Sequence, residues 1–443
     1  MLLRTLCMMH NMLKRGPKVS APLIIKGGTP LSGEVRVSPA KNAVLPILAA
    51  SLLTPEPVEL VEVPRLRDIE VMLELLAHLG TRYAWEGRRL YLETPEILRT
   101  DAPYELVAKM RASFIVLGAL LARAGEGSVS LPGGCAFGPR PVDQHVKALR
   151  KIGARVEEEG GRFRAERVRP FRGRVVFDVP TVGGTEQVLL AAALGEAEVT
   201  LVNAAQEPEI ADLAAFLARM GVGIEGAGTS RIRVRGARRL SGVHDYRVIP
   251  DRIEAGTYLL AAAATRGRVR LVGVEAGHLD ALLDKLVEAG HRVWVEGDRI
   301  EFQATPEPRP FNLEAREYPG FPTDLQPIAG AYLATVPGTS LVSDRVYPER
   351  FTHAAELARM GAELALKERT LAITGRPLFG AEVRALDIRA GGALVVAALA
   401  AGGETRIEGT EHLERGYEDL EAKLRGLGAE LGRAELRLEE AAD

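Results

Sequence analysis

A thiol at Cys135 stands in a loop rich in glycine and proline, shortly before the guanidinium of Arg140. Three glycines and three prolines lie between 132 and 141. The glycines allow backbone turns that a side chain would forbid, and the prolines restrict the loop, so it could present the thiol to a ligand. The alternative is that Cys135 is a small buried hydrophobe, as most lone intracellular cysteines are. Other cations in similar glycine- or proline-rich settings, far apart in the sequence, favour the ligand-binding hypothesis.

The composition is that of a globular chain with a sizeable core, since 47% of its 443 residues are hydrophobic. The charges nearly balance, with 57 Lys plus Arg against 59 Asp plus Glu, and no dense basic cluster occurs. A nucleic-acid-binding protein would carry a basic field, so we expect no nucleic-acid partner. The length predicts two or more domains.

The cysteine and histidine spacings exclude two common kinds of site. The two cysteines, Cys7 and Cys135, cannot build a disulfide framework, and the Cys-x-x-Cys or His-x-x-x-His spacings of metal sites are missing. We therefore expect no metal, no cofactor and a cytoplasmic, reducing environment.

Three apolar runs, at 43–53, 114–122 and 393–401, are about half as long as the roughly 20 residues that span a bilayer. We expect buried core helices there and no membrane partner. Arg4 interrupts an apolar stretch that is already too short for a signal sequence, so residues 1–20 are expected to be a disordered extension or an over-long start.

A unit of about 70 residues repeats along the chain. Each copy contains an amphipathic helix that ends at a glycine, where a left-handed C-terminal cap belongs. In the first copy, the apolar side chains from Ile69 to Leu79 follow helical spacing after an expected cap at Asp68. Short alternating segments that suit a β-hairpin follow several of these helices, at 82–92, 155–165 and 292–302. The glycines are Gly80, Gly153, Gly221, Gly290, Gly361 and Gly428.

Each copy also contains a second helix that is apolar most of the way round, followed by a short strand. Such helices should lie inside, covered by sheets and by the amphipathic helices. The second helices are predicted at 41–53, 111–124, 185–194, 253–265, 324–334 and 389–401. The strands are predicted at 58–63, 128–131, 198–202, 268–272, 339–342 and 405–407. Six copies predict two domains of three repeats each.

With the loop and the repeat established, the chain resembles the UDP-N-acetylglucosamine enolpyruvyltransferases, also called 1-carboxyvinyltransferases, of the EPSP synthase superfamily. The resemblance covers residues 23–429. The motifs that carry it are Ala40-Lys41-Asn42-Ala43, Met110-Arg111-Ala112-Ser113, the Cys135 loop, Glu207-Pro208-Glu209, Pro250-Asp251-Arg252-Ile253-Glu254, Phe321-Pro322-Thr323-Asp324, Arg350-Phe351, Asp387-Ile388-Arg389 and Arg415-Gly416-Tyr417.

The resemblance implies an α/β fold of two inside-out α/β barrel domains, built from six βαβ-type repeats. By position, 43–248 would form the domain with the nucleotide-sugar contacts and the Cys135 loop. The second catalytic domain would contain 21–42 and 249–443, with the active site in the cleft between the two. The implied activity is the first committed step of peptidoglycan precursor synthesis.

The resemblance assigns Cys135 as the acid that protonates the methylene carbon of phosphoenolpyruvate. A positioned acid typically contributes about 10² to 10⁴ in rate. Arg140 nearby would favour the thiolate, which cannot donate a proton. We therefore expect bound ligand anions to offset Arg140 and keep the thiol protonated. Fosfomycin, an epoxide that mimics the donor and alkylates the cysteine of this family, is expected to add at Cys135.

Asp324 matches the family carboxylate that contacts the 3-hydroxyl of the sugar, which makes it the expected general base. From local sequence alone, Asp324 could equally cap the helix that follows it. Both roles could coexist.

The substrates bring a carboxylate, a phosphate and a diphosphate, so the site must gather permanent cations. Arginine suits bidentate contacts with such anions, and preorganised positive charge stabilises a leaving phosphate. The resemblance places Lys41, Arg140 and Arg415 closest to phosphoenolpyruvate and Asn42 beside the reacting centre, and Lys41 and Arg415 join the catalytic group. Asp387 and Arg389 resemble a supporting ion pair. The expected cations are Lys41, Arg111, Arg140, Arg350, Arg389 and Arg415.

For the nucleotide sugar, the resemblance implies a uracil site and a diphosphate site. Arg140 and Pro141 would sandwich the uracil, with Asp143 and Gln144 nearby. The diphosphate would meet Thr181-Val182-Gly183, where free amides precede a helix N-terminus. Val346 completes the expected substrate contacts.

Two departures from the family pattern bear on binding. Val179 stands where relatives often have a lysine near the diphosphate, which could weaken nucleotide affinity. Pro348-Glu349-Arg350 replaces the more usual Glu-Asn-Arg. The effect of this second change on Glu349 is open.

Two other functions compete with this prediction. One is a non-catalytic paralogue that binds a UDP-sugar and regulates wall synthesis; Cys135, Asp324 and the cation set argue against it. The other is 5-enolpyruvylshikimate-3-phosphate synthase, which shares the fold and donor but lacks the cysteine loop. The expected partners are thus UDP-N-acetylglucosamine and phosphoenolpyruvate, and the sequence leaves the oligomeric state open.

Overall fold

The computed structural model describes residues 20–131 and 142–434, except for the side chain of Arg111. These residues divide into two compact units. Unit 1 contains 39–131 and 142–249, and unit 2 contains 20–38 and 250–434. The chain therefore enters unit 1 after Ser38 and returns to unit 2 at Pro250.

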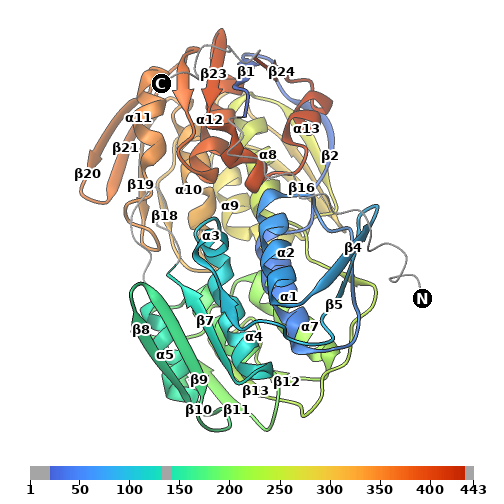
Figure 1. The fold of residues 1–443 in the computed structure, drawn as a ribbon. Helices are drawn as coiled ribbons and strands as arrows, with labels where there is room; N and C mark the ends of the chain where they lie inside the picture. Colours follow the sequence, from blue (N-terminus) through green and yellow to red (C-terminus); the bar gives the residue numbers. More distant parts are fainter. Residues whose placement is uncertain (1–19, 132–141, 435–443) are drawn as a thin grey trace, which may run out of the picture. The chain divides into compact units, whose positions relative to one another are not determined.

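Unit 1 has three four-stranded sheets among its described residues, in the orders β14-β3-β5-β4, β6-β7-β9-β8 and β10-β11-β13-β12 (Figure 1). The strands are β3 (Val58–Val61), β4 (Arg82–Glu86), β5 (Arg89–Glu93), β6 (Asp101–Ala102), β7 (Glu126–Ser130), β8 (Ala154–Glu159), β9 (Arg162–Arg167), β10 (Arg172–Val176), β11 (Glu198–Val202), β12 (Gly223–Glu225), β13 (Arg231–Arg235) and β14 (Tyr246–Arg247). The helices are α1 (Lys41–Ala50), η2 (Ser51–Leu53), α2 (Arg67–Leu79), α3 (Tyr104–Val107), η3 (Arg111–Ile115), α4 (Val116–Arg123), α5 (Asp143–Ile152), α6 (Val182–Ala191) and α7 (Pro208–Met220).

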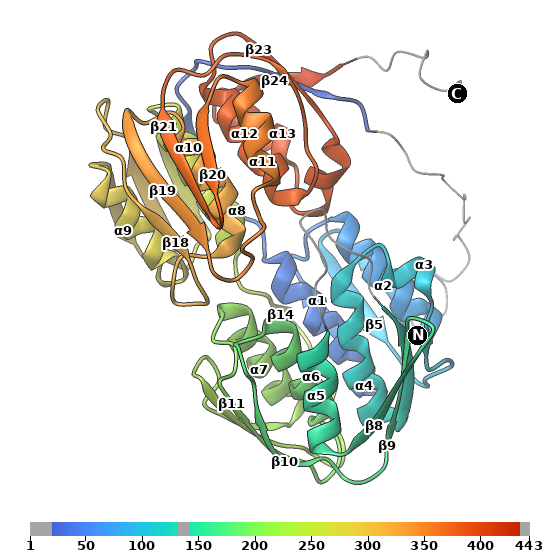
Figure 2. The same ribbon diagram turned by 90° about the vertical axis from the view of Figure 1, so that its left-hand side faces the viewer.

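Unit 2 repeats this plan, and over 20–38 and 250–434 its sheets have the orders β16-β17-β15-β2, β18-β19-β21-β20 and β22-β23-β1-β24. The four strands of the second of these sheets are labelled in Figure 2. The strands are β1 (Leu23–Lys26), β2 (Ser32–Arg36), β15 (Arg268–Val272), β16 (Arg292–Glu296), β17 (Arg299–Gln303), β18 (Leu313–Ala315), β19 (Gly338–Asp344), β20 (Glu363–Lys367), β21 (Thr370–Gly375), β22 (Glu382–Arg384), β23 (Glu404–Glu408) and β24 (Glu430–Arg433). The helices are α8 (Arg252–Ala264), η4 (Ala276–Leu279), α9 (Asp280–Glu288), η5 (Thr323–Leu325), α10 (Gln326–Leu333), α11 (Thr352–Arg359), α12 (Ile388–Ala400), η6 (Thr410–Arg415) and α13 (Leu420–Gly426).

The sheets share one topology. A strand after the second helix of each copy pairs in parallel with a strand at the sheet edge and antiparallel with the next strand inward, as β11 does with β10 and β13. The sequence predicted the central strand and the hairpin but not the parallel edge strand. Some of these edge strands, such as β6 and β14, are too short to show an alternating pattern.

The N-terminal strand completes the last sheet of unit 2. Leu23 pairs with Ile407 of β23 and with Arg433 of β24, so β1 lies between the two C-terminal strands (Figure 1). The next strand, β2, pairs in parallel with β15. Both ends of the described chain therefore belong to unit 2.

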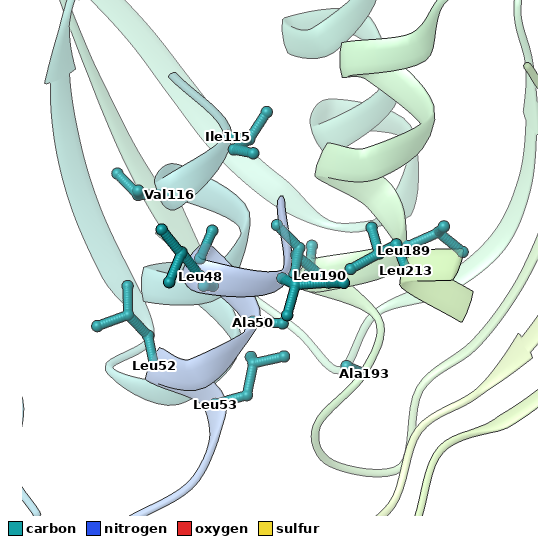
Figure 3. Packing of buried hydrophobic residues seen from close by; sticks show 14 of the residues in the cluster. Leu48, Ala50, Leu52, Leu53, Ile115, Val116, Leu189, Leu190, Ala193 and Leu213 are labelled. Atoms are coloured by element: carbon teal, nitrogen blue, oxygen red, sulfur yellow. The ribbon is translucent and has the colours of Figure 1, made fainter. Parts of the chain in front are cut away.

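The second helix of each copy lies inside its unit, as its apolar sequence predicted. Every residue of α10 is buried, and in α1 every residue except Asn42 is buried. Figure 3 shows how side chains from the apolar helices of unit 1 meet in its core. The labelled core residues are Leu48, Ala50, Leu52, Leu53, Ile115, Val116, Leu189, Leu190, Ala193 and Leu213. The prediction of buried core helices is confirmed, and no helix in the described ranges is both long and apolar enough to cross a membrane.

The glycines that mark the amphipathic helices adopt the left-handed conformation that their positions predicted. Gly80 follows α2 with φ 120°, and Gly221 follows α7 with φ 111°. Residues with a Cβ are strained there, which explains why the repeat is punctuated by glycine.

Candidate active site

Asp324 lies in η5, between two buried arginines of unit 2. Its Oδ1 accepts a hydrogen bond from Arg350 Nη1 at 2.7 Å, and its Oδ2 accepts one from Arg389 Nη2 at 2.8 Å. Both arginine side chains are 5% exposed, whereas Asp324 is 22% exposed. Because charge-assisted hydrogen bonds are strong and directional, the two guanidinium groups fix the orientation of a carboxylate that still reaches solvent.

The alternative role of Asp324, a helix cap, is not the one that the structure shows. The N-cap positions are Pro322 for η5 and Leu325 for α10. The carboxylate instead points to cations that are distant in sequence. This leaves the role of an anionic base open to Asp324.

A second carboxylate, that of Asp344, is linked to this cluster through Thr323. Thr323 Oγ1 accepts from Arg350 Nη1 at 3.0 Å and donates to Asp344 Oδ2 at 2.6 Å. Oδ1 of Asp344 accepts from the backbone N–H groups of Val346 and Tyr347, at 2.9 and 2.7 Å. Burial raises the pKa of Asp344, although these hydrogen bonds oppose the shift. Asp344 therefore shapes the turn that carries Val346 and Arg350.

Asp387 and Arg389 do not form the ion pair that the sequence suggested. Asp387 caps α12, since its Oδ1 accepts from the backbone N–H groups of Arg389 and Ala390 at 2.9 and 3.0 Å, and its Oδ2 accepts from Thr352. A cap folds back over the first turn, while the Arg389 side chain extends away to Asp324. Burial would lower the pKa of the Arg389 guanidinium, but the charges of Asp324, Tyr417 and Asp251 together outweigh burial and raise the pKa.

Arg415 is the last residue of η6 and is partly exposed. Tyr417 follows two positions later and is buried, with its ring centroid 5.8 Å from Arg389 Cζ. Unit 2 therefore brings Asp324, Arg350 and Arg389 together through direct contacts, and places Arg415 on the segment whose Tyr417 ring lies beside Arg389.

In unit 1, Lys41 begins α1 and is held by a buried ion pair. Its Nζ lies 3.0 Å from Asp68 Oδ2, and the two side chains are 8% and 4% exposed. The prediction of Asp68 as a cap is wrong, because the N-cap of α2 is Leu66 and the carboxylate turns to Lys41. Asn42, next to Lys41, is partly buried.

The expected nucleotide residues Asp143 and Gln144 start α5. Gln144 Nε2 donates to Asp178 Oδ2 at 3.0 Å, and Gln144 Oε1 accepts from the Asp178 N–H at 3.2 Å. A hydrogen bond from Lys147 lowers the pKa of Asp178. Val179 is 57% exposed beside this pair, so the side chain that departs from the family pattern faces solvent.

Thr181, Val182 and Gly183 form the N-terminus of α6. Thr181 is the N-cap, and its Oγ1 accepts from the Gly184 N–H at 3.2 Å. A Cβ at Gly183 would lie 2.8 Å from Cε1 of the buried His145, so glycine is required for this close approach. The helix N-terminus retains the amides and dipole that favour an anion.

Several predicted residues lie outside the described part of the chain. They are Cys135, Arg140 and Pro141, together with the side chain of Arg111, whose backbone begins η3. The thiol and the uracil sandwich therefore stay predictions.

Comparison with known proteins decides the family. The profile of the EPSP synthase family, described as EPSP synthase (3-phosphoshikimate 1-carboxyvinyltransferase), matches residues 25–424. The UDP-N-acetylglucosamine 1-carboxyvinyltransferase of a Thermus thermophilus strain is 69% identical over 96% of this chain and 100% of the relative. The chain belongs to the EPSP synthase family, among the UDP-N-acetylglucosamine 1-carboxyvinyltransferases. The resemblance inferred from its motifs is confirmed.

Other members of the EPSP synthase family agree with this assignment. The UDP-N-acetylglucosamine 1-carboxyvinyltransferase of Deinococcus radiodurans is 54% identical over 93% of this chain and 96% of its own. The enolpyruvyl transferase NikO from Streptomyces tendae superposes with a TM-score of 0.84 at 26% identity, covering 94% of this chain and 99% of NikO. EPSP synthase from Acinetobacter baumannii, at 17% identity and a TM-score of 0.71 over 94% of this chain and 100% of its own, shares the fold. The predicted enolpyruvyltransferase fold is therefore confirmed.

Sequence reasoning missed the residues that support the predicted ones. Asp68, Thr323 and Asp344 each bond to a site residue or to its turn. Asp68 gave a helix-start signal that fits a cap equally well, and Asp344 gave no signal beyond its place at the end of a strand. Tyr417 stood inside a family motif, but nothing in the sequence indicated its contact with Arg389.

Proposed function

We propose that this protein transfers the enolpyruvyl group of phosphoenolpyruvate to the 3-hydroxyl of UDP-N-acetylglucosamine and releases inorganic phosphate. The observation that carries the proposal is the full-length identity of 69% to a carboxyvinyltransferase named for this acceptor. The buried Arg350–Asp324–Arg389 cluster supports it, because transfer needs both a base and fixed positive charge. The reaction would commit the sugar nucleotide to peptidoglycan synthesis and thereby to cell wall biogenesis.

In the addition step, Asp324 accepts the proton of the sugar hydroxyl while the oxygen bonds to the central carbon of phosphoenolpyruvate. Cys135 gives a proton to the methylene carbon, which becomes a methyl group. The product is a tetrahedral intermediate that carries sugar, carboxylate and phosphate on one carbon. In the elimination step, the methyl group loses a proton, the double bond forms again and phosphate leaves.

The cations have distinct tasks in this proposal. Lys41, Arg140 and Arg415 bind phosphoenolpyruvate and stabilise the departing phosphate. Arg350 and Arg389 hold Asp324 in place. This role is more specific than the sequence-based expectation, which named the two arginines only as cations of the site. We also propose that the two sets act in a cleft between the domains, where closure would exclude water.

Two features of the chain favour UDP-N-acetylglucosamine as the acceptor substrate. In unit 1, the α6 N-terminus offers amides to the diphosphate, and Asp143 and Gln144 start the helix beside it. A regulatory UDP-sugar-binding protein would not need the Asp324 cluster, and a shikimate-phosphate enzyme would not need Cys135.

Since both substrates are intracellular metabolites and the chain has two cysteines, we propose that the protein acts in the cytoplasm.

Phosphate release tests the proposal directly. The protein should release phosphate from phosphoenolpyruvate only when UDP-N-acetylglucosamine is present. Asp324→Asn should lower kcat by about 10² to 10⁴, because it removes the base. Asp284→Asn, which changes an exposed aspartate of α9, is the matched control and should leave kcat unchanged.

Four outcomes would decide against the proposal or one of its parts. No release by the folded protein would favour a binding module, and release with shikimate-3-phosphate instead would favour the sister enzyme. Full activity of Asp324→Asn would refute the base. Fosfomycin should block turnover and add its mass to the peptide that contains Cys135, so an unmodified peptide after inhibition would exclude the thiol.

A further inference from the structure

Tyr417 occupies a buried position that links two groups of the proposed site. It is 3% exposed, and its ring lies beside the Arg389 guanidinium. Its hydroxyl is 3.1 Å from Oγ1 of Thr257, a buried residue of α8. The same short segment carries Arg415, so one stretch of chain lies beside Arg389 and also presents Arg415, an expected phosphoenolpyruvate ligand.

The direction of the hydrogen bond can be derived from the partners of Thr257. A threonine hydroxyl has one hydrogen, and Thr257 Oγ1 donates it to the carbonyl oxygen of Ile253 at 2.8 Å. Tyr417 must then be the donor to Thr257, which leaves the lone pairs of its oxygen for Arg389. The Arg389 Cζ atom lies 5.8 Å from the centroid of the Tyr417 ring, and Tyr417 is among the groups that raise the Arg389 pKa. Burial raises the pKa of Tyr417, so the phenol keeps the proton that this arrangement needs.

Two glycines allow the phenol and its segment to approach α12 this closely. A Cβ at Gly392 would lie 2.5 Å from the Tyr417 oxygen, and a Cβ at Gly416 would lie 2.5 Å from Ile388 Cγ2. Gly392 is one turn beyond Arg389 on α12. The helix that carries Arg389 therefore makes room at Gly392 for the Tyr417 hydroxyl.

The other end of the segment is anchored separately. Glu418 is buried, and its Oε2 accepts from Ser38 Oγ at 2.6 Å. Lys423 Nζ donates to Ser38 Oγ at 2.7 Å and to Glu254 Oε1 at 2.6 Å. Because both Tyr417 and Glu418 are fixed, the backbone that leads to Arg415 has little freedom.

We propose that Tyr417 and Thr257 are positioning residues for the transfer reaction. Thr257 orients the Tyr417 hydroxyl, the hydroxyl holds Arg389 against Asp324, and the Tyr417 backbone holds Arg415. This role rests on the proposed function. Neither residue needs to touch a substrate, since each acts through the arginines.

The test uses conservative variants of the full chain in the phosphate-release assay. Thr257→Val and Tyr417→Phe should each lower kcat by about tenfold, because Arg389 would no longer hold the base Asp324 in place. The KM for UDP-N-acetylglucosamine should stay within about twofold, because the nucleotide contacts are expected in unit 1. Thr257→Ser keeps the hydroxyl and should restore kcat to near the parent value. The double variant Thr257→Val/Tyr417→Phe should be no worse than Tyr417→Phe, since the two residues act in series.

Tyr332→Phe is the matched control, because Tyr332 is a buried tyrosine of unit 2 whose hydroxyl bonds to His291 instead. It should leave kcat unchanged. The positioning role is overturned by a fully active Thr257→Val, by effects that multiply in the double variant, or by a rise in the KM for UDP-N-acetylglucosamine with kcat unchanged. If the parent protein, without any substitution, releases no phosphate, that result refutes the proposed function instead. If Tyr417→Phe fails to fold, the Thr257 variants still decide the question.

Discussion

Replacing Asp68 by asparagine tests how much the buried ion pair with Lys41 stabilises unit 1. The Lys41 Nζ and Asp68 Oδ2 atoms are 3.0 Å apart, and the side chains are 8% and 4% exposed. Asparagine keeps the shape and one acceptor oxygen but removes the negative charge. The lysine ammonium then stays buried beside a neutral group.

The magnitude follows from the distance and the burial. With an effective dielectric constant of about 20, unit charges 3.0 Å apart attract by about 5 kcal/mol, and desolvation offsets part of this. Removing one partner of a buried pair costs about 3 to 5 kcal/mol, and the retained hydrogen bond favours the lower end. For a unit of this size, a loss of about 3 kcal/mol lowers the melting temperature by about 6 to 12 °C.

Calorimetry of the full chain measures this shift, and a Lys41 that is no longer held in place should also lower kcat. The control is Glu196→Gln, which breaks an ion pair with Arg238 whose side chains are 66% and 85% exposed. Exposed pairs contribute about 0 to 1 kcal/mol, so the control should barely move the transition. A decrease below about 2 °C for Asp68→Asn, or equal shifts for both variants, would refute the reasoning.

Three further predictions concern unit 1. Burial raises the pKa of Asp212 to about 6, so the folded chain keeps a proton that the unfolded chain loses near pH 4. The free energy of unfolding should therefore fall by up to about 3 kcal/mol as the pH rises from about 4 to 6. Asp212→Asn should remove this fall, and urea titrations with the same pH dependence for variant and parent would contradict it. Gly183→Ala places a Cβ 2.8 Å from His145 Cε1 and should raise the KM for UDP-N-acetylglucosamine about tenfold; an unchanged KM would exclude the α6 N-terminus as the diphosphate site. Val179→Lys adds a cation at an exposed position and should lower that KM about two- to fivefold at low salt, and a KM that does not depend on salt would count against it.

The repeat could be predicted from the sequence because its signals are local. A glycine after the last apolar residue of a helix, as at Gly80 or Gly221, reports a backbone conformation that few other residues tolerate. Helices that are apolar all round, such as α10, can lie only in a core. The edge strands escaped prediction because pairing with a distant strand, and not their own pattern, makes them strands.

The site was harder to predict than the fold because its contacts join residues far apart in sequence. Asp68 and Asp324 each precede or begin a helical run, and both look like caps until Lys41 and the two arginines are placed in space. Asp387, which does cap its helix, has the same local signature. At each of these carboxylates, the local sequence could not tell a helix cap from an ion-pair partner.

The place of β1 between β23 and β24 has a consequence for synthesis on the ribosome. Residues 39–249, which contain unit 1, emerge together and can fold while the rest is translated. The first strand of unit 2 leaves the ribosome before them but must wait for its partners near the end of the chain. At about 5 to 20 residues per second, that wait lasts about 20 to 80 s. A strand made early is therefore among the last to reach its native neighbours, and in the meantime its edges are open to wrong pairing.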